Sequence, residues 1–171
     1  PKHIVLYKAL NWTVPQFAHL PLLLNSDKTK LSKRKNDVSV ESYISKGYLK
    51  ESLVNFLALL GWHEKGDREI YNLNELIESF SLERVNKSGA IFDVQKLNSF
   101  NHHYLQELSL DQINSIIEFP SDWDIKNEML ELIKDKCYSL HDFKKNLEIF
   151  FIDHINLSDD DISHLNTSTS I

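Results

Sequence analysis

The sequence predicts a mainly α-helical protein. Its 171 residues include only 4 Gly and 4 Pro, so residues that break helices are scarce. Most segments carry apolar residues at helical spacing, and Ser, Asn and Asp stand where helices would begin. The hydrophobic content of 42% suffices for one ordinary core or two small ones. We therefore expect capped helices packed around one or two cores.

The amino-terminal part combines an expected strand with a short helix. Residues 17–24 form an apolar run of strand length, and residues 25–27 after it have the composition of a turn. The basic residues that follow, at 28–35, should therefore lie on a loop beyond a strand. Ser39 is expected to cap a short helix, which Gly47 ends in a left-handed conformation.

Three further helices are expected before residue 101. They run from about Lys50 to Gly61, from Asn72 to Phe80 and from Asp93 to Phe100. The first has a broad apolar face typical of a core helix, and Asn72 with Glu75 forms a capping pattern. The tight spacing of these elements predicts one folded unit up to about residue 100.

The remaining sequence predicts helices in series. Their expected caps are Ser109 with Gln112, Asp124, Ser139 and Ser158. The segment 119–122 is a clear break, and the apolar positions of the helices suit a small bundle. We therefore expect a second, all-helical domain.

The basic cluster at 28–35 stands out from an acidic chain. It holds five Lys and Arg residues and no acid, whereas the rest of the chain has 14 basic against 25 acidic residues, a formal charge of −11. A solvated loop is the ordinary interpretation of such a cluster. Within Lys30-Leu31-Ser32-Lys33-Arg34, however, Leu31 can anchor the loop and Ser32 can orient a phosphate. Fixed cations on such a loop suit adenylyl transfer from ATP, because negative charge grows on the departing pyrophosphate.

The pentapeptide 30–34 resembles the second signature of class I aminoacyl-tRNA synthetases, in the form used by bacterial and organellar glutamyl-tRNA synthetases. Further segments resemble the same family in order: 17–25, 37–43, 46–49, 55–62, 80–85 and 92–93, followed by 96–97 and 101. The resemblance covers roughly residues 3–105. Two positions depart from it, Asn36 where Gly is common and Ser99 where an aromatic residue is common.

The resemblance implies a division of the chain and a role for its residues. Residues 1–35 would end the catalytic nucleotide-binding fold, 36–105 would be the stem-contact domain, and 106–171 would start the anticodon-binding helices. Lys33 would be the catalytic cation on the ATP phosphates. The ATP-binding set would be Lys30, Ser32, Lys33 and Arg34. We assign tRNA contacts to Lys35, Trp62, Arg84 and Lys87, although Arg84 and Lys87 could instead pair with acids such as Glu83.

The resemblance also implies partners and a parent enzyme. We expect a glutamate–tRNA ligase that uses ATP with Mg²⁺, glutamate and tRNA, as a monomer. The sequence starts at Pro1 without an initiator Met or a signal peptide, so we interpret it as a cut inside a longer protein. The family's other ATP signature and its glutamate site are not found in this sequence, so we expect this chain alone to be inactive. Two alternatives remain open: a non-catalytic tRNA-binding module, and a glutamyl ligase that modifies a tRNA base.

Other features receive ordinary interpretations. No apolar run is long enough to span a bilayer, and the single Cys137 indicates a reducing compartment, the cytoplasm or an organellar matrix. The set His102, His103, Cys137 and His141 lacks the paired ligands of structural zinc, and 159–161 lacks the Gly and Glu of a calcium loop. We expect no structural metal, and we interpret the three Trp residues mainly as core.

Overall fold

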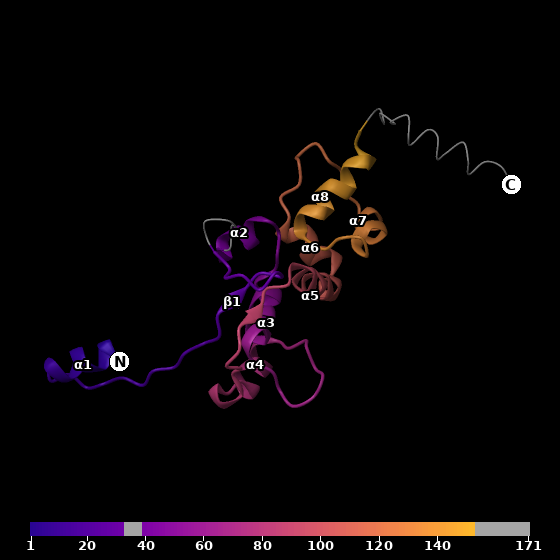
Figure 1. The fold of residues 1–171 in the computed structure, drawn as a ribbon. Coiled ribbons are helices and arrows are strands. Elements are labelled where there is room, and N and C mark those ends of the chain that lie inside the picture. Colours follow the sequence, from indigo (N-terminus) through magenta and orange to yellow (C-terminus); the bar gives the residue numbers. More distant parts are fainter. Residues whose placement is uncertain (33–38, 153–171) are drawn as a thin grey trace.

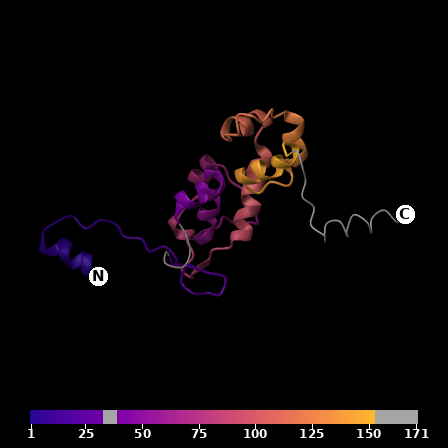
Figure 2. The same cartoon turned by 90° about the horizontal axis from the view of Figure 1, so that it is seen from above.

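The computed structural model of the protein describes residues 1–32 and 39–152. Its elements are α1 (Lys2–Ala9), β1 (Leu23–Leu24), α2 (Val40–Ser45), α3 (Lys50–Gly61), α4 (Leu73–Ser79), η1 (Leu82–Arg84), β2 (Ala90–Ile91), α5 (Val94–Glu107), α6 (Leu110–Ile116), α7 (Asn127–Lys134), α8 (Leu140–Leu147) and η2 (Glu148–Phe150). The prediction of a mainly helical protein is confirmed. Figures 1 and 2 show α2–α4 on one side of α5 and α6–α8 on the other, with α1 standing apart from both.

The two strands form a small parallel sheet, in which Leu23 lies opposite Ala90 and Leu24 opposite Ile91. The strand expected over 17–24 is therefore limited to its last two residues. Pro21 has no N–H to donate to a ladder, and Leu20 before it is 70% exposed. After β2, the Phe92 amide still donates to the Leu24 carbonyl at 2.8 Å, immediately before α5 begins.

Side-chain caps begin five helices at the residues that the sequence predicts. The caps and the backbone N–H groups that they accept from are Ser39 with Ser42, Asn72 with Glu75, Asp93 with Gln95 and Lys96, Ser109 with Gln112, and Ser139 with Asp142. Gly47 has the expected left-handed conformation, with φ +85°. The cap expected at Ser158 lies outside the described residues. Helix α1 was not anticipated, and no residue of it is buried.

The start predicted for α7 at Asp124 is wrong, because the helix begins at Asn127 after the uncapped Lys126. Trp123 and Ile125 both pack against the same buried cluster. An extended backbone places residues two apart on one face, whereas a helix would turn them away from each other. Tertiary packing therefore delays the helix. The core interpretation is likewise wrong for Trp12, which is 60% exposed.

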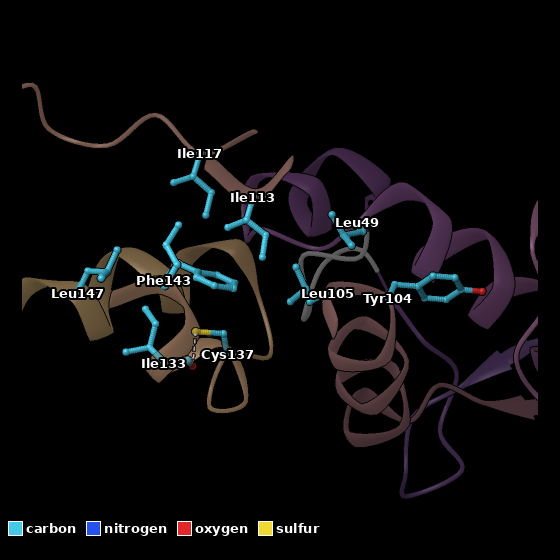
Figure 3. Close-up of a cluster of buried hydrophobic side chains, with 10 residues drawn as sticks. Leu49, Tyr104, Leu105, Ile113, Ile117, Ile133, Cys137, Phe143 and Leu147 are labelled. Carbon is cyan, nitrogen blue, oxygen red and sulfur yellow. Dashed lines mark hydrogen bonds between the residues drawn. The ribbon is translucent and has the colours of Figure 1, made fainter. Parts of the chain in front are cut away.

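Three buried clusters make up the core of the described chain. One lies between α3 and α5, formed by Leu53, Phe56, Leu97 and Phe100. Another contains Trp62, Tyr71 and Leu76. The largest joins Leu49, Tyr104 and Leu105 to Ile113, Ile117, Leu130, Ile133, Cys137, Phe143 and Leu147, most of which Figure 3 labels. Helix α5 runs past the expected end at Phe100 because its last turns bury Tyr104 and Leu105 in this cluster. The domain boundary expected after residue 105 falls within this helix and stays a prediction.

A buried junction joins α3, α5 and α8. The Asn101 side chain on α5 accepts hydrogen bonds from the Leu49 amide and the Ser52 hydroxyl, each at 2.8 Å, and donates to the Tyr138 carbonyl at 2.6 Å. Next to it, the Leu140 amide at the start of α8 donates to the Gly47 carbonyl at 2.9 Å. A Cβ on Gly47 would lie only 2.8 Å from the His141 nitrogen, so the contact requires glycine.

Candidate functional site

A tight hairpin carries the first residues of the basic loop. The chain turns back after β1, so that Lys30 forms an antiparallel bridge with Leu24. The Leu31 amide then donates to the Leu23 carbonyl at 3.0 Å. The sheet and the hairpin thus share β1, which fixes where the basic loop leaves the body of the molecule.

The turn of this hairpin is built by polar side chains, as its composition predicts. Asp27 Oδ1 accepts from both the backbone N–H (2.9 Å) and the hydroxyl (2.6 Å) of Thr29. The Asn25 amide group donates to the Thr29 hydroxyl at 3.0 Å. Lys28 adopts φ +64°, a left-handed conformation that costs a side-chain-bearing residue energy. These bonds hold Lys28 at an exposed tip, and Lys30 beyond it is also exposed.

Leu31 anchors the loop, as the sequence predicts. It lines an apolar hollow of about 350 Å³ together with Leu53 and Leu57 of α3 and with Phe92. Val40, the first residue of α2, lines the same hollow. Leu31 and Val40 therefore line the same apolar hollow.

Only part of the predicted ATP set falls within the described structure. Lys30 is exposed and Ser32 is half-buried, and both lie on the hairpin side of the loop. Lys33, Arg34 and Lys35, together with the departure at Asn36, lie outside the described residues. Their roles stay predictions.

Two of the predicted tRNA-binding residues meet in one surface hollow of about 650 Å³. Its lining residues are His63, Glu64, Lys65, Gly66, Asp67, Glu83, Arg84, Val85, Asn86 and Lys87, and we call it the polar hollow. The Asn86 amide donates to the Gly61 carbonyl at 2.7 Å, and Trp62 forms an antiparallel bridge with Val85. These backbone contacts bring Arg84 and Lys87 beside the 63–67 loop.

Trp62, the third of these residues within the described structure, lies in the core. Its side chain is 1% exposed and packs edge-to-face on Tyr71, with ring centroids 6.0 Å apart. A buried ring cannot stack on a base, which corrects the prediction of a tRNA contact at Trp62. Its indole nitrogen has no hydrogen-bond partner among the described residues.

A set of polar contacts shapes the 63–67 wall of the polar hollow. The Tyr71 hydroxyl, whose single proton both bonds share, lies 3.2 Å from Glu64 Oε2 and 3.1 Å from the Arg68 carbonyl. Burial, reinforced by the bond to Glu64, raises the pKa of Tyr71 above its usual value, so the phenol keeps this proton. Arg68 pairs with Glu75 and lies over the Tyr71 ring. Hydrogen bonding from Arg68 lowers the pKa of the Glu75 carboxyl.

Sequence reasoning did not single out Glu64 and Lys65. Both belong to a polar loop that the pattern only marks as exposed, and they lie about twenty positions from Arg84. The pairing of Trp62 with Val85 creates the hollow, and the spacing of residues in the sequence does not predict that pairing.

The His and Cys residues considered for zinc have structural contacts. His102 stacks on Tyr138, with ring centroids 4.7 Å apart, and its Nδ1 lies 3.0 Å from the Cys137 carbonyl. Cys137 is fully buried, and burial raises the pKa of its thiol to about 11. Within residues 1–32 and 39–152, no group of three His, Cys, Asp or Glu side chains could hold a metal ion. Over the same residues, no helix combines the length and apolar character needed to cross a membrane.

Comparison with known protein families gives one family match. The model described as tRNA synthetases class I (E and Q), catalytic domain, matches residues 1–99 of the chain. This range contains the hairpin, the basic loop and the polar hollow. It also ends within α5, before the helices α6–α8.

Individual relatives and a solved structure belong to the same family as this match. A glutamate–tRNA ligase of Alkaliphilus metalliredigens is 40% identical over 164 residues, which cover 88% of this chain and 33% of the relative. One from Chlorobium phaeobacteroides is 55% identical over 120 residues, covering 69% and 24%. The crystal structure of a glutamate-tRNA synthetase from Elizabethkingia anophelis matches 95% of this chain and 38% of that chain, with a TM-score of 0.74 and 28% identity. The chain thus spans about a third of the length of such relatives.

Proposed function

Because the chain belongs to the family of class I tRNA synthetases for glutamate and glutamine, we propose that it is part of a glutamate–tRNA ligase. The parent enzyme would activate glutamate with ATP and transfer it to tRNA. The observation that carries the proposal is the Lys30–Arg34 segment. Its residue Leu31 lines the apolar hollow beside the hairpin, and the whole segment lies inside the family match. Its substrates would then be glutamate, tRNA and ATP, and Mg²⁺ would accompany the ATP.

Charge and position support the role of the basic loop. Lys30 is exposed at the base of the loop, and Leu31 beside it is held in the apolar hollow. In this proposal Lys33, two positions beyond Leu31, acts on the ATP phosphates. There Lys33 stabilises the pyrophosphate as the glutamate carboxylate attacks the α-phosphate and the α–β phosphoanhydride bond breaks. Lys30, Ser32 and Arg34 hold the loop and the remaining phosphate oxygens.

The rest of the chain is proposed to engage tRNA. Lys35 and the two cations of the polar hollow, Arg84 and Lys87, would contact tRNA phosphates. We retain the division at 1–35, 36–105 and 106–171 into the end of the catalytic fold, a stem-contact domain and the start of an anticodon-binding region. The proposed parent is a cytoplasmic or organellar-matrix monomer.

The decisive experiment replaces Lys33 by Ala in the complete enzyme. The expected loss of about 2–4 kcal/mol of transition-state stabilisation slows adenylate formation by a factor of about 30 to 10³. The rate would be followed by glutamate-dependent exchange of pyrophosphate into ATP with tRNA present. Lys28→Ala is the matched control, because it removes an exposed charge of the same cluster outside the pentapeptide. An unchanged rate in Lys33→Ala would refute the assignment. Equal losses in both variants would show that the total positive charge of the cluster matters and that Lys33 has no specific role.

The 171-residue chain itself gives a second test. We expect it to show no pyrophosphate exchange, because the glutamate site and the other ATP signature are expected outside this sequence. Exchange above background by the purified chain would contradict that expectation. If the complete enzyme also lacked exchange while binding tRNA, the alternative of a non-catalytic tRNA-binding module would replace the ligase.

A further inference from the structure

The hairpin that carries the basic loop turns through a strained three-residue connection. The Lys28 amide donates to the Asn25 carbonyl at 2.9 Å, and the Asn25 amide donates to the Thr29 carbonyl at 2.8 Å. Residues 26–28 therefore form the connection, and Lys28 is its last residue. Hairpins of this kind favour glycine at that position, because it needs a left-handed conformation. Lys28 adopts this conformation, with φ +64°, at a cost that glycine would not have.

Polar side chains on both sides of Lys28 offset this strain. The Thr29 hydroxyl acts twice, since it donates to Asp27 Oδ1 at 2.6 Å and accepts from the Asn25 amide group at 3.0 Å. The same Asp27 oxygen accepts from the Thr29 N–H at 2.9 Å. Thr29 thus joins the other two residues, and removing its hydroxyl would break two of these bonds at once.

The charge of Asp27 does not favour ATP. Asp27 immediately precedes the five Lys and Arg residues of the basic cluster, and its carboxylate would repel a phosphate that those cations attract. Its two bonds from Thr29 give this acid a different use, which is to shape the turn. A variant that keeps an acceptor oxygen but removes the charge can separate this use from an action of the charge on Mg²⁺ or on a cation.

The base of the hairpin is held closely by the body of the molecule. A Cβ on Gly61, the last residue of α3, would lie 2.7 Å from Pro21 Cγ. A Cβ on Gly89, just before β2, would lie 2.7 Å from Leu24 Cδ1. Both contacts leave the strand little room to shift, so the turn is the part of the hairpin whose conformation can vary.

We propose that Asn25, Asp27 and Thr29 are positioning residues for adenylate formation, because their bonds hold the strained turn in the form that sets the start of the basic loop against β1. This inference rests on the proposed function, in which Lys33 acts on the ATP phosphates. It concerns the path of the chain up to Ser32, since Lys33 lies outside the described residues. The three residues act through Lys33 and are not assigned a contact with ATP.

The first test replaces Thr29 by Val in the complete enzyme and measures glutamate-dependent exchange of pyrophosphate into ATP with tRNA present. The turn is exposed and strained, so the loss of two hydrogen bonds should leave it formed in only a fraction of the molecules. We expect kcat to fall about fivefold, with the KM for ATP within about twofold, because the contact of Lys33 with the pyrophosphate strengthens in the transition state.

Two variants accompany this test. Thr29→Ser keeps the hydroxyl and should retain kcat within about twofold. Ser26→Ala is the matched control, because Ser26 is exposed in the same turn and takes no part in the bonds among Asn25, Asp27 and Thr29. Urea unfolding of each variant confirms that it is folded.

Asp27 is tested with a pair of variants. Asp27→Ala removes the acceptor of two bonds and should lower kcat about fivefold. Asp27→Asn keeps an acceptor oxygen without the charge and should retain kcat within about twofold. An equal loss in the two variants would show that the charge itself acts, and it would overturn the positioning role of Asp27.

Two double variants test how the turn acts. Lys28→Gly relieves the backbone strain and should restore most of the kcat lost in Thr29→Val. Because Thr29 acts through Lys33, adding Thr29→Val to Lys33→Ala should lower the remaining rate by less than about twofold.

Amide exchange of Leu31 reports on the hairpin without any chemistry on ATP. Its N–H donates to the Leu23 carbonyl across the hairpin, so exchange in the 171-residue chain should become about fivefold faster in Thr29→Val. An unchanged exchange rate would show that the side-chain bonds do not hold the turn, and it would overturn the inference.

Several kinetic outcomes would also overturn it. They are an unchanged kcat in Thr29→Val, a loss confined to the KM for ATP, a loss that Thr29→Ser or Ser26→Ala shares, and a full further loss when Thr29→Val is added to Lys33→Ala. In each case the effect of Lys33→Ala alone still stands, and with it the proposed function. An unchanged rate in Lys33→Ala would instead refute the assignment on which this inference rests.

Discussion

The basic-loop hairpin and the junction of α3, α5 and α8 differ in the distance along the chain that their hydrogen bonds span. In the hairpin, Asn25 and Asp27 bond to Thr29 across four and two positions. In the junction, Asn101 bonds to Leu49 across 52 positions and to Tyr138 across 37. The hairpin tip is exposed, whereas the Asn101 side chain is 0% exposed.

This difference separates the part of the molecule that can adjust from the part that holds it together. Bonds between near neighbours can open without disturbing the remaining fold, whereas long-range buried bonds break only when helices separate. Lys30, one of the cations proposed to act on ATP, belongs to the adjustable part. The stability of the helical body depends on the junction. Four predictions test this difference between the hairpin and the junction.

The largest effect is expected for Asn101→Ala in the junction. The substitution leaves the buried Leu49 amide and the part-buried Tyr138 carbonyl without their partner, and a group left in this way costs about 1–3 kcal/mol. We expect a loss of about 4 kcal/mol in the free energy of unfolding by urea. Asn98→Ala on the same helix is the control. It removes only the half-buried bond from the Tyr48 hydroxyl and should cost about 1 kcal/mol. Equal losses of unfolding free energy in the two variants would show that the junction contributes no more to stability than the bond at Asn98.

The next effect is expected for Gly47→Ala. Its φ of +85° and a Cβ only 2.9 Å from the Leu140 nitrogen combine backbone strain with a clash, for a loss of about 3 kcal/mol. Gly66→Ala has the strain without the clash, because no atom lies near its Cβ, and should cost about 1 kcal/mol. Urea unfolding of both variants measures the difference. Similar losses would mean that backbone conformation alone, and not the contact with α8, requires Gly47.

A smaller effect comes from the buried Cys137 beside the junction. Its folded pKa of about 11 exceeds the ordinary value of 9.0, so the folded state holds its proton more tightly than the unfolded chain does. The resulting stabilisation is complete below pH 9 and is lost as pH rises through 11. The stability difference between the unaltered protein and Cys137→Ala should therefore shrink from pH 8 to pH 11. A difference that stays constant with pH would contradict the raised pKa.

The smallest effect on the whole molecule is expected for Lys28→Gly in the hairpin. Glycine relieves the left-handed strain at φ +64°, but a hairpin that opens on its own leaves the global unfolding free energy within about 0.5 kcal/mol. Exchange of the Leu31 amide, bonded to the Leu23 carbonyl, should instead slow about tenfold. If the global stability rose by the full relief of strain, the hairpin would unfold with the junction and the comparison would fail.

The sequence by itself determined the features that depend on neighbouring residues. Ser39, Asn72 and Ser109 start helices because each side chain bonds a backbone N–H three residues on. The Asn25–Thr29 turn and the anchor at Leu31 follow equally from local chemistry. The order of motifs in residues 3–105 also pointed to the family that the comparison then matched over 1–99.

Only the tertiary structure decided features that depend on distant partners. The strand over 17–24 shrank to β1 because its ladder partner is the short β2, and α7 started late because Trp123 and Ile125 enter the core together. Trp62 went into the core because Tyr71 and Leu76 close over it. The hollow that Glu64 and Arg84 both line has the same origin, since burial and long-range pairing are properties of the folded chain and not of any short segment.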